Sequence, residues 1–404
     1  DKAYPPPLAG FDRLSPEVTD RNGRLLRAFV NPDGRWRLPV TLSEVDPDFI
    51  DLLISYEDRR FYRHPGIDPL AMGRALWQMA LHRRIVSGGS TITMQTARLL
   101  EPRPDRTVGA KILQMARALQ LERRLSKTEI LQLYLTLAPY GGNVEGIRAA
   151  TLAYFGKEPG RLTVAEAALL VALPQSPEAR RPDRDPQAAR AARDRVLDRL
   201  VIAGVLGAEE AAAARRDPVP TGRRPFPMLA AHLAEQALET DGEDNVLRLT
   251  LDRPLQAALE ALASDRVRTL GPKLSIAVVV ADQQSGDILA SVGSAGLLDE
   301  ARNGHVDMTQ AVRSPGSTLK PLIYGLAFEE GLAHPSSLIE DRPIGYGPYA
   351  PQNFDGTYRG TVTVREALVQ SLNIPAIVVL DAVGPARLVA RIKRAGVSAE
   401  LPKL

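Results

Sequence analysis

The chain has 404 residues, of which 44% are hydrophobic and 25% are charged, and its formal net charge is +3. This composition is typical of globular proteins, and the length predicts two domains. The sequence has no cysteine, which excludes disulfides and thiol chemistry. It has no apolar run of the ~18 residues that are needed to span a bilayer. It also lacks a nucleotide-binding phosphate loop and the basic, aromatic-interleaved stretches that are typical of nucleic-acid binding.

The first 45 residues are rich in proline and turn-forming residues, and Asp20-Arg-Asn-Gly-Arg24 predicts a hairpin turn between two short strands. A helical pattern begins at Pro47 and leads into Glu57. Residues 69–84 form a second apolar stretch that ends in two arginines. This stretch predicts either a buried core helix or a helix whose apolar side enters the membrane interface.

Helices are also predicted through the middle of the chain. Residues 107–135 predict one or two long helices, with Ser126 and Glu129 as a capping-box pattern at the start of the second. Another helix is predicted from Thr163 to Leu173, before a proline, with Thr163 and Glu166 as a second capping-box pattern. Residues 178–217 are rich in alanine and arginine and predict helices that face solvent.

The pattern then changes from helices to alternating elements. Four prolines between residues 218 and 227 predict a linker. The elements predicted after it are a strand at 246–251, a helix at 252–269, and strands at 274–281 and 287–292 joined by a turn at Gln284-Ser-Gly286.

Two short motifs near the end of the sequence carry acyl-transfer chemistry. Ser317 and Lys320 have S-x-x-K spacing, and Ser371-Leu-Asn373 is an S-x-N element. One helical turn separates Ser317 from Lys320, so a nucleophile and its base would face one site. An isolated S-x-x-K is more often a surface turn, but together the two motifs are the signature of penicillin-binding proteins and related acyl-serine enzymes. The third element of that signature, K-T-G, does not occur before Leu404, so we expect a truncated acyl-transfer domain.

Several upstream motifs support a second resemblance. Residues 57–68 read Glu-Asp-Arg-Arg-Phe-Tyr-Arg-His-Pro-Gly-Ile-Asp, residues 88–95 read Gly-Gly-Ser-Thr-Ile-Thr-Met-Gln, and further motifs lie at 119–135 and 154–157. In this order they resemble the motifs of peptidoglycan glycosyltransferases. Followed by the S-x-x-K domain, they resemble a class A (bifunctional) penicillin-binding protein, most closely the 1C type, over roughly residues 40–404.

The resemblance implies roles for the first site. Glu57 would be the base that deprotonates the 4-hydroxyl of the acceptor sugar. The pyrophosphate leaving group needs cations and hydrogen-bond donors rather than a strong acid. The implied substrate-binding residues are Asp58, Phe61, His64, Gly89, Ser90, Thr91, Gln95, Lys111 and Gln114. Taken singly, Glu57-Asp58 could be a salt-bridged helix turn and His64 a packed core residue; the order of the motifs together favours a catalytic site.

The third glycosyltransferase motif departs from the family pattern. Where most members have R-K-x-x-E, this chain has Ala110-Lys-Ile-Leu-Gln114, and Thr136 stands where Asn is common. Transfer to a hydroxyl with a pyrophosphate leaving group needs only the base, so an amide at position 114 is chemically tolerable. No cofactor is firmly implied; a divalent cation (Mg²⁺) at the pyrophosphate is the one candidate, and Gln114 weakens it.

At the second site, Ser317 would attack the carbonyl between two D-alanines of a stem peptide, and a neutral Lys320 would accept its proton. Ser371 would relay protons to the leaving amine, and Asn373 would bind the substrate amide. β-Lactams would acylate Ser317. Without the K-T-G strand, which supplies part of the oxyanion hole in the family, we expect little or no acylation.

The sequence therefore predicts a multidomain protein with a mainly α, lysozyme-like glycosyltransferase domain and an α/β penicillin-binding domain. The predicted domains are an N-terminal segment at 1–45, the glycosyltransferase at 46–217, a linker region at 218–272 and a partial transpeptidase at 273–404. The expected partners are lipid II, the growing glycan strand, stem peptides, β-lactams and the membrane surface. We expect the periplasmic face of a bacterial inner membrane, with the family's N-terminal anchor removed before Asp1.

Two alternatives stay open. The protein could be a transferase whose second domain is only a docking module. It could also be a non-catalytic scaffold that binds lipid-linked precursors or partner proteins, with Gln114 as a sign of lost activity.

Overall fold

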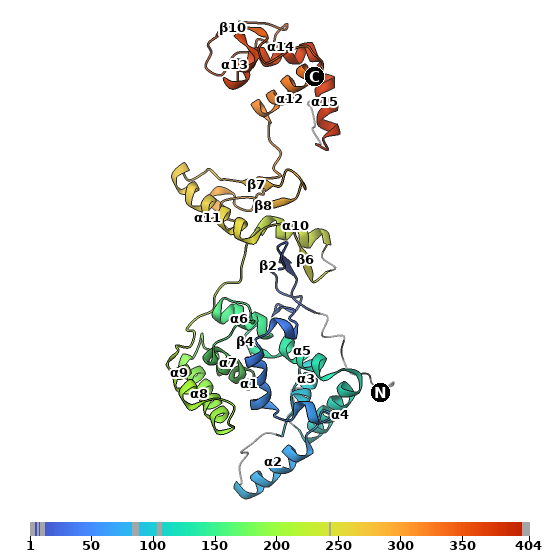
Figure 1. Cartoon of the computed structure of the whole chain (residues 1–404), viewed down its shortest axis with the longest axis vertical. Helices are drawn as coiled ribbons and strands as arrows, with labels where there is room; N and C mark the ends of the chain where they lie inside the picture. The colour runs from blue at the N-terminus through green and yellow to red at the C-terminus, as the bar shows by residue number, and fades with distance from the viewer. Residues whose placement is uncertain are drawn as a thin grey trace. The chain divides into compact units, whose positions relative to one another are not determined.

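The computed structural model describes residues 5, 8, 13–82, 89–102, 107–241 and 244–397. The chain forms two compact units, Asp1–Ala311 and Val312–Leu404 (Figure 1). This division falls later than the predicted start of a second domain at residue 273. The boundaries of the functional domains stay a prediction.

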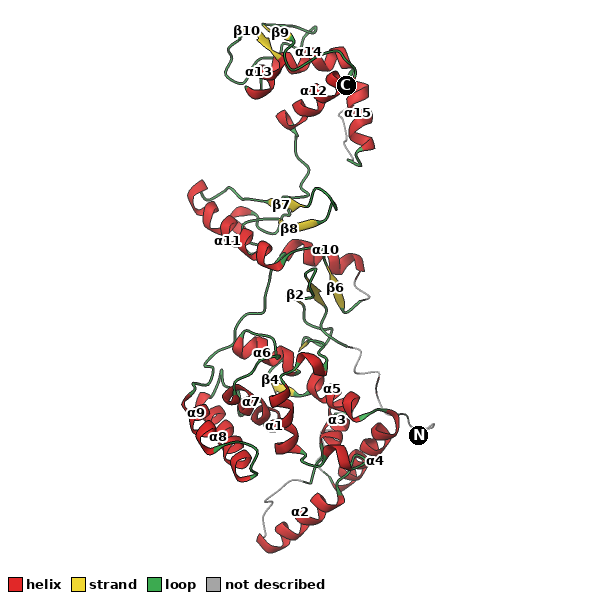
Figure 2. Ribbon diagram, in the orientation of Figure 1, coloured by secondary structure: helices red, strands yellow, loops and turns green. Residues whose placement is uncertain are grey.

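Most of the first unit is helical, as Figure 2 shows in red. Its larger hydrophobic core joins the helices that carry the upstream motifs. In chain order these helices are α1 (Pro47–Glu57), α2 (Pro69–His82), α3 (Ile92–Leu100), α4 (Val108–Arg124), α5 (Lys127–Leu137), α6 (Ile147–Phe155), α7 (Val164–Ala172), α8 (Pro186–Ile202) and α9 (Ala208–Arg216). Helix α7 packs against α1 and α8, and α3 packs against α4 and α5.

Local capping explains where several helices begin. Ser126 accepts from the backbone N–H of Glu129, whose side chain accepts from Ser126 in return, and Thr163 forms the same capping box with Glu166. Both boxes were predicted, and both are confirmed. The prediction that residues 178–217 only face solvent is wrong. Helix α8 buries one side in the core, and its Arg193 is 1% exposed while donating to two backbone carbonyls.

Two small sheets tie the N-terminal segment to the rest of the first unit. The predicted hairpin is present as β1 (Glu17–Thr19) and β2 (Leu25–Ala28), and β1 pairs in parallel with β6 (Val246–Arg248). The second sheet has the order β3-β5-β4 and consists of β3 (Trp36–Arg37), β4 (Pro139–Gly141) and β5 (Val144–Glu145). These pairings place residues 13–45 within the folded unit.

Residues 218–272 do not form an isolated linker. Phe226 stacks on Trp36 with ring centroids 4.2 Å apart, and the backbone N–H of Arg224 donates to the carbonyl of Ala153. The segment then forms α10 (Ala231–Asp241), β6 and α11 (Arg253–Leu270), which confirms the predicted helix after residue 252. Helix α11 packs on β8 (Ile288–Val292), the partner of β7 (Val278–Ala281).

The second unit is a small α/β module with its own core. It begins with a 3₁₀ turn at Gly316–Leu319 that continues into α12. Its elements are α12 (Lys320–Glu329), β9 (Leu338–Asp341), β10 (Gly360–Thr363), α13 (Val364–Val369), α14 (Asn373–Val383) and α15 (Pro385–Arg394). Strands β9 and β10 are antiparallel, and α14 packs against α12 and α15. A helical domain followed by an α/β domain confirms the predicted fold class.

Among the described residues, no single helix is both long and apolar enough to cross a membrane. The pair α14 and α15 reaches that length only when joined across a bend of 86°.

Candidate active sites

Glu57 ends helix α1 with both carboxylate oxygens hydrogen-bonded. Gln95 Nε2 of α3 donates to Oε2 at 2.9 Å, and Gln175 Nε2 donates to Oε1 at 2.7 Å. The carboxylate is only partly buried, so it stays open to solvent. Two neutral donors therefore fix its orientation without cancelling its charge.

Gln175 is the site residue that sequence reasoning missed. It lies in the 3₁₀ turn Leu173–Gln175 after α7, where the sequence showed only a proline that ends a helix. Arg180 Nη1 donates to Gln175 Oε1 at 3.0 Å, so the amide nitrogen of Gln175 must face Glu57. A polar residue directly after the helix-ending Pro174 was the only signal in the sequence.

Asp58 and His64 form a buried brace behind Glu57. Asp58 is 7% exposed and accepts from His64 Nε2 at 2.9 Å and from the backbone N–H of Ile92 at 3.0 Å. His64 Nδ1 accepts from the backbone N–H of Gly66 at 3.2 Å, which assigns the proton to Nε2. The brace joins the end of α1 to the start of α3, consistent with the orienting role expected for Asp58.

Phe61 and Thr91 also make contacts within the protein in this region. Phe61 is fully buried, with the Lys127 ammonium 4.5 Å from its ring centroid. Thr91 caps α3 by accepting from Met94, and its hydroxyl donates to the Gly66 carbonyl at 2.6 Å. The Thr91 hydroxyl is thus engaged within the protein, so its role in substrate binding stays a prediction.

A cationic group lies beside the start of α3. Lys111 Nζ donates to Ser90 Oγ at 3.2 Å and to Gln114 Oε1 at 3.0 Å. The Gln114 amide in turn donates to the Met94 carbonyl. Partial burial lowers the pKa of Lys111, and the nearby charge of Arg98 lowers it further. The structure thus joins Ser90, Lys111 and Gln114 in one hydrogen-bonded group.

The glycine-rich turn is only partly described. A Cβ at Gly89 would lie 3.2 Å from Met72 Cα, so glycine permits the close approach of this turn to α2. Gly88, Arg83 and Arg84 lie outside the described residues.

The carboxylates here do not form a ligand set for a divalent cation. Both Glu57 oxygens accept from amides, Asp58 serves the buried brace, and position 114 is an amide whose oxygen accepts from Lys111. In the part of the chain that the structure describes, no group of three or more histidine or acidic side chains could hold a metal. Mg²⁺ carried by the pyrophosphate stays a prediction.

In the second unit, three of the four candidate residues are joined by hydrogen bonds. Lys320 is 6% exposed, and its ammonium donates to Ser371 Oγ at 3.1 Å, to Asn373 Oδ1 at 2.8 Å and to the Ser371 carbonyl. Burial lowers the pKa of Lys320. Ser317 lies one turn earlier and is exposed, and its carbonyl accepts from the backbone N–H of Lys320. Among the described residues, the hydrogen bonds of the Lys320 ammonium do not include the Ser317 hydroxyl.

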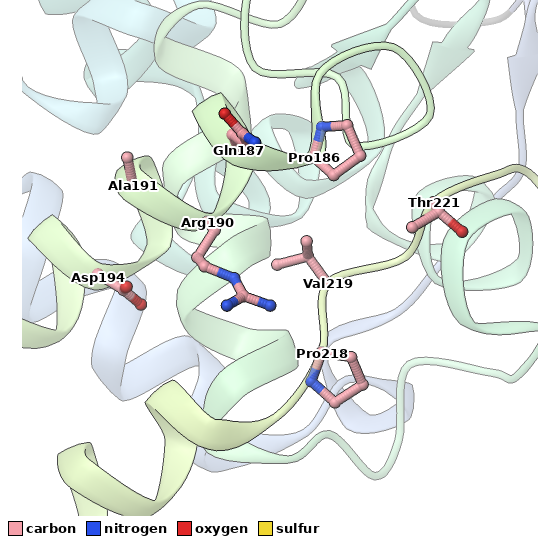
Figure 3. Close-up of a pocket in the computed structure, with 8 residues that line it drawn as sticks. All are labelled: Pro186, Gln187, Arg190, Ala191, Asp194, Pro218, Val219 and Thr221. Carbon is pink, nitrogen blue, oxygen red and sulfur yellow. The ribbon is translucent and has the colours of Figure 1, made fainter.

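One hollow in the first unit is lined by other residues. It is formed by one side of α8 and by residues 218–221, with Arg190 between them (Figure 3). None of its lining residues is a candidate site residue, so it plays no part in either site.

Comparison with known proteins assigns a family to each part of the chain. The transglycosylase family matches residues 22–201, and the penicillin-binding protein transpeptidase domain matches residues 276–403. The chain is 46% identical over 404 residues to penicillin-binding protein 1C of Escherichia coli (strain K12), covering 100% of this chain and 52% of that protein. It is 32% identical over 398 residues to penicillin-binding protein 1F of Bacillus subtilis (strain 168), covering 92% and 53%. The chain thus spans about half the length of the curated relatives it matches.

A solved structure aligns less well. The 2.6 Å crystal structure of penicillin-binding protein 1A from Haemophilus influenzae covers 96% of this chain and 64% of that chain, at 19% identity and a TM-score of 0.41. Because that score is low, the family assignment rests on the sequence matches.

Proposed function

Because the chain belongs to the class A penicillin-binding proteins, we propose that its first domain polymerises lipid II into peptidoglycan glycan strands. The observation that supports this best is the arrangement of Glu57. An oriented, partly solvent-exposed carboxylate lies at the end of α1. Helix α3 carries Gln95, α4 carries Lys111 and Gln114, and Ser90 lies just before α3.

In the proposed reaction, the Glu57 carboxylate accepts the proton of the acceptor sugar 4-hydroxyl. The hydroxyl oxygen then attacks the anomeric carbon of the growing strand, and the bond from that carbon to the undecaprenyl pyrophosphate breaks. Lys111 and Ser90 supply a cation and a hydroxyl donor for the charge on the leaving group. A second acidic residue is not required, because pyrophosphate leaves without being protonated.

Substitution of the base tests this proposal. Glu57→Gln keeps the size and the hydrogen-bonding capacity of the side chain but removes its basicity, so polymerisation of labelled lipid II should fall at least ~100-fold. Glu209→Gln, on exposed α9, is the matched control and should leave the rate unchanged. Near wild-type polymerisation by Glu57→Gln, with an unchanged circular dichroism spectrum, would refute the assignment. A chain that binds lipid II without forming any polymer would instead favour the scaffold alternative.

For the second domain we propose D,D-transpeptidase chemistry, with Ser317 as nucleophile and Lys320 as its base. The support is the buried Lys320, hydrogen-bonded to both residues of the S-x-N element. Stem peptides and β-lactams are the proposed ligands. The proposed location is the periplasmic face of the inner membrane, where lipid II is used.

A further inference from the structure

Helix α14, which carries the S-x-N asparagine as its first residue, has no cap of its own. The residue at its N-cap position, Leu372, offers no side-chain hydrogen bond. Asn353 supplies it from a loop twenty residues earlier: its Oδ1 accepts from the backbone N–H of Asn373 at 2.8 Å and of Ile374 at 3.4 Å. These are the N–H groups that a helix start leaves without a partner.

The amide nitrogen of Asn353 is hydrogen-bonded as well. Its Nδ2 donates to both oxygens of Asp341, at 2.8 and 3.0 Å, and to the Thr357 carbonyl at 2.9 Å. Asp341 is fully buried at the end of β9 and also accepts from the backbone N–H of Arg359 at 2.8 Å. A flipped amide would turn its oxygen to the Asp341 carboxylate, so these contacts set one orientation for Asn353.

The capped segment has a conformation that needs support. Ser371 has a φ of +55°, which is the left-handed region that residues with a side chain rarely adopt. Its carbonyl and hydroxyl both accept from Lys320, and Asn373 Oδ1 accepts the third hydrogen bond of that ammonium. The position of α14 therefore decides whether the Lys320 ammonium can donate these three hydrogen bonds.

We propose that Asn353, held by Asp341, is a positioning residue of the acyl-transfer site. By capping α14 from the loop, it keeps Ser371 and Asn373 where both hydrogen-bond Lys320. The catalytic meaning of this inference rests on the proposed transpeptidase function, but the arrangement itself can be tested without any acylation.

The test follows the titration of Lys320 by NMR in the ¹⁵N-lysine-labelled 404-residue chain, which has only eight lysines. Asn353→Ala should admit water to the Lys320 ammonium and raise its measured pKa toward the ordinary lysine value, because burial is what lowers that pKa. Amide exchange at Asn373 and Ile374 should become faster in the same variant.

A double variant that exchanges the two residues, with Asp at position 353 and Asn at position 341, provides a second test in case Asn353→Ala does not fold. Asn353→Asp alone places two carboxylates together and should disturb Lys320. Adding Asp341→Asn restores a donor–acceptor pair and should return the Lys320 titration toward the wild-type curve.

Thr363→Ala is the matched control, because Thr363 caps the neighbouring helix α13 in the same way without a contact to Lys320. It should lower the melting temperature and leave the Lys320 titration unchanged. If Asn353→Ala also lowers only the melting temperature, Asn353 is merely structural and the inference is wrong. Because no step requires a penicillin, failure of acylation in a form extended through a K-T-G strand would count against the proposed function and not against this arrangement.

Discussion

Three glutamines define the first candidate site, and neighbouring groups set the orientation of two of them. Gln175 accepts from Arg180 and turns its nitrogen to Glu57, while Gln114 accepts from Lys111 and donates to a backbone carbonyl. An amide both donates and accepts, so it can join two groups where a carboxylate could only accept. The amide at position 114 is therefore built into the site as a link between α3 and Lys111.

Gln114→Glu should preserve polymerisation. The carboxylate would lose the donor to the Met94 carbonyl but would pair with Lys111, and a new acidic group should strengthen the dependence on Mg²⁺. Polymerisation of labelled lipid II with and without chelator measures both effects. Complete loss of activity would show that the amide has a more specific role.

Gln175→Ala should lower the polymerisation rate about tenfold, because one hydrogen bond to a charged group contributes about 1.5 kcal/mol. Gln175→Glu should lower it further, since a second carboxylate would face Glu57. Steady-state kinetics with labelled lipid II can compare them with the control Gln187→Ala, at an exposed position of α8. If Gln175→Ala and Gln175→Glu polymerise as fast as the Gln187→Ala control, Gln175 is not part of the site.

At the scale of elements, α2 differs most from its neighbours. Its Leu70 and Trp77 are each 70% exposed, which disfavours the buried-core alternative for these two residues. Large apolar side chains exposed on a helix favour the alternative in which α2 enters the membrane interface.

The double variant Leu70→Asp, Trp77→Asp should therefore bind liposomes at least ~10-fold more weakly than the wild type, because two apolar anchors are lost. Liposome co-sedimentation measures this. The control is Val108→Asp, Ile202→Asp, which changes two equally exposed apolar residues at the ends of α4 and α8. Equal binding by both double variants and the wild type would exclude α2 from the membrane contact.

At the scale of the whole molecule, two modules of different chemistry follow one another in the chain. The second has Ser317 as its proposed nucleophile, the buried Lys320 as the proposed base and an S-x-N element, but the sequence contains no K-T-G. In the family that strand completes the oxyanion hole, and losing one such donor costs roughly 3–4 kcal/mol.

The 404-residue chain should therefore be labelled weakly or not at all by a fluorescent penicillin. A form extended through a K-T-G strand should be labelled, and Ser317→Ala should abolish that labelling. Intact-protein mass spectrometry gives the stoichiometry. Rapid, complete acylation of the 404-residue chain at Ser317 would mean that the strand is dispensable.

The sequence by itself determined the order of the modules and the starts of several helices. Capping at Ser126 and Thr163 depends on residues three positions apart, so a local pattern reveals it. The S-x-x-K and S-x-N motifs are equally local. Such features are visible because their partners lie within one helical turn.

Only the tertiary structure decided which distant groups meet. Gln175 lies 118 residues after Glu57, β1 pairs with a strand more than 220 residues later, and Asn353 caps a helix that starts 20 residues on. No local sequence pattern indicates these contacts, because their partners are far apart in the sequence and meet only when the chain folds. For the same reason, residues 218–227 were predicted as a linker: the sequence shows their prolines but not the Trp36 ring on which Phe226 stacks.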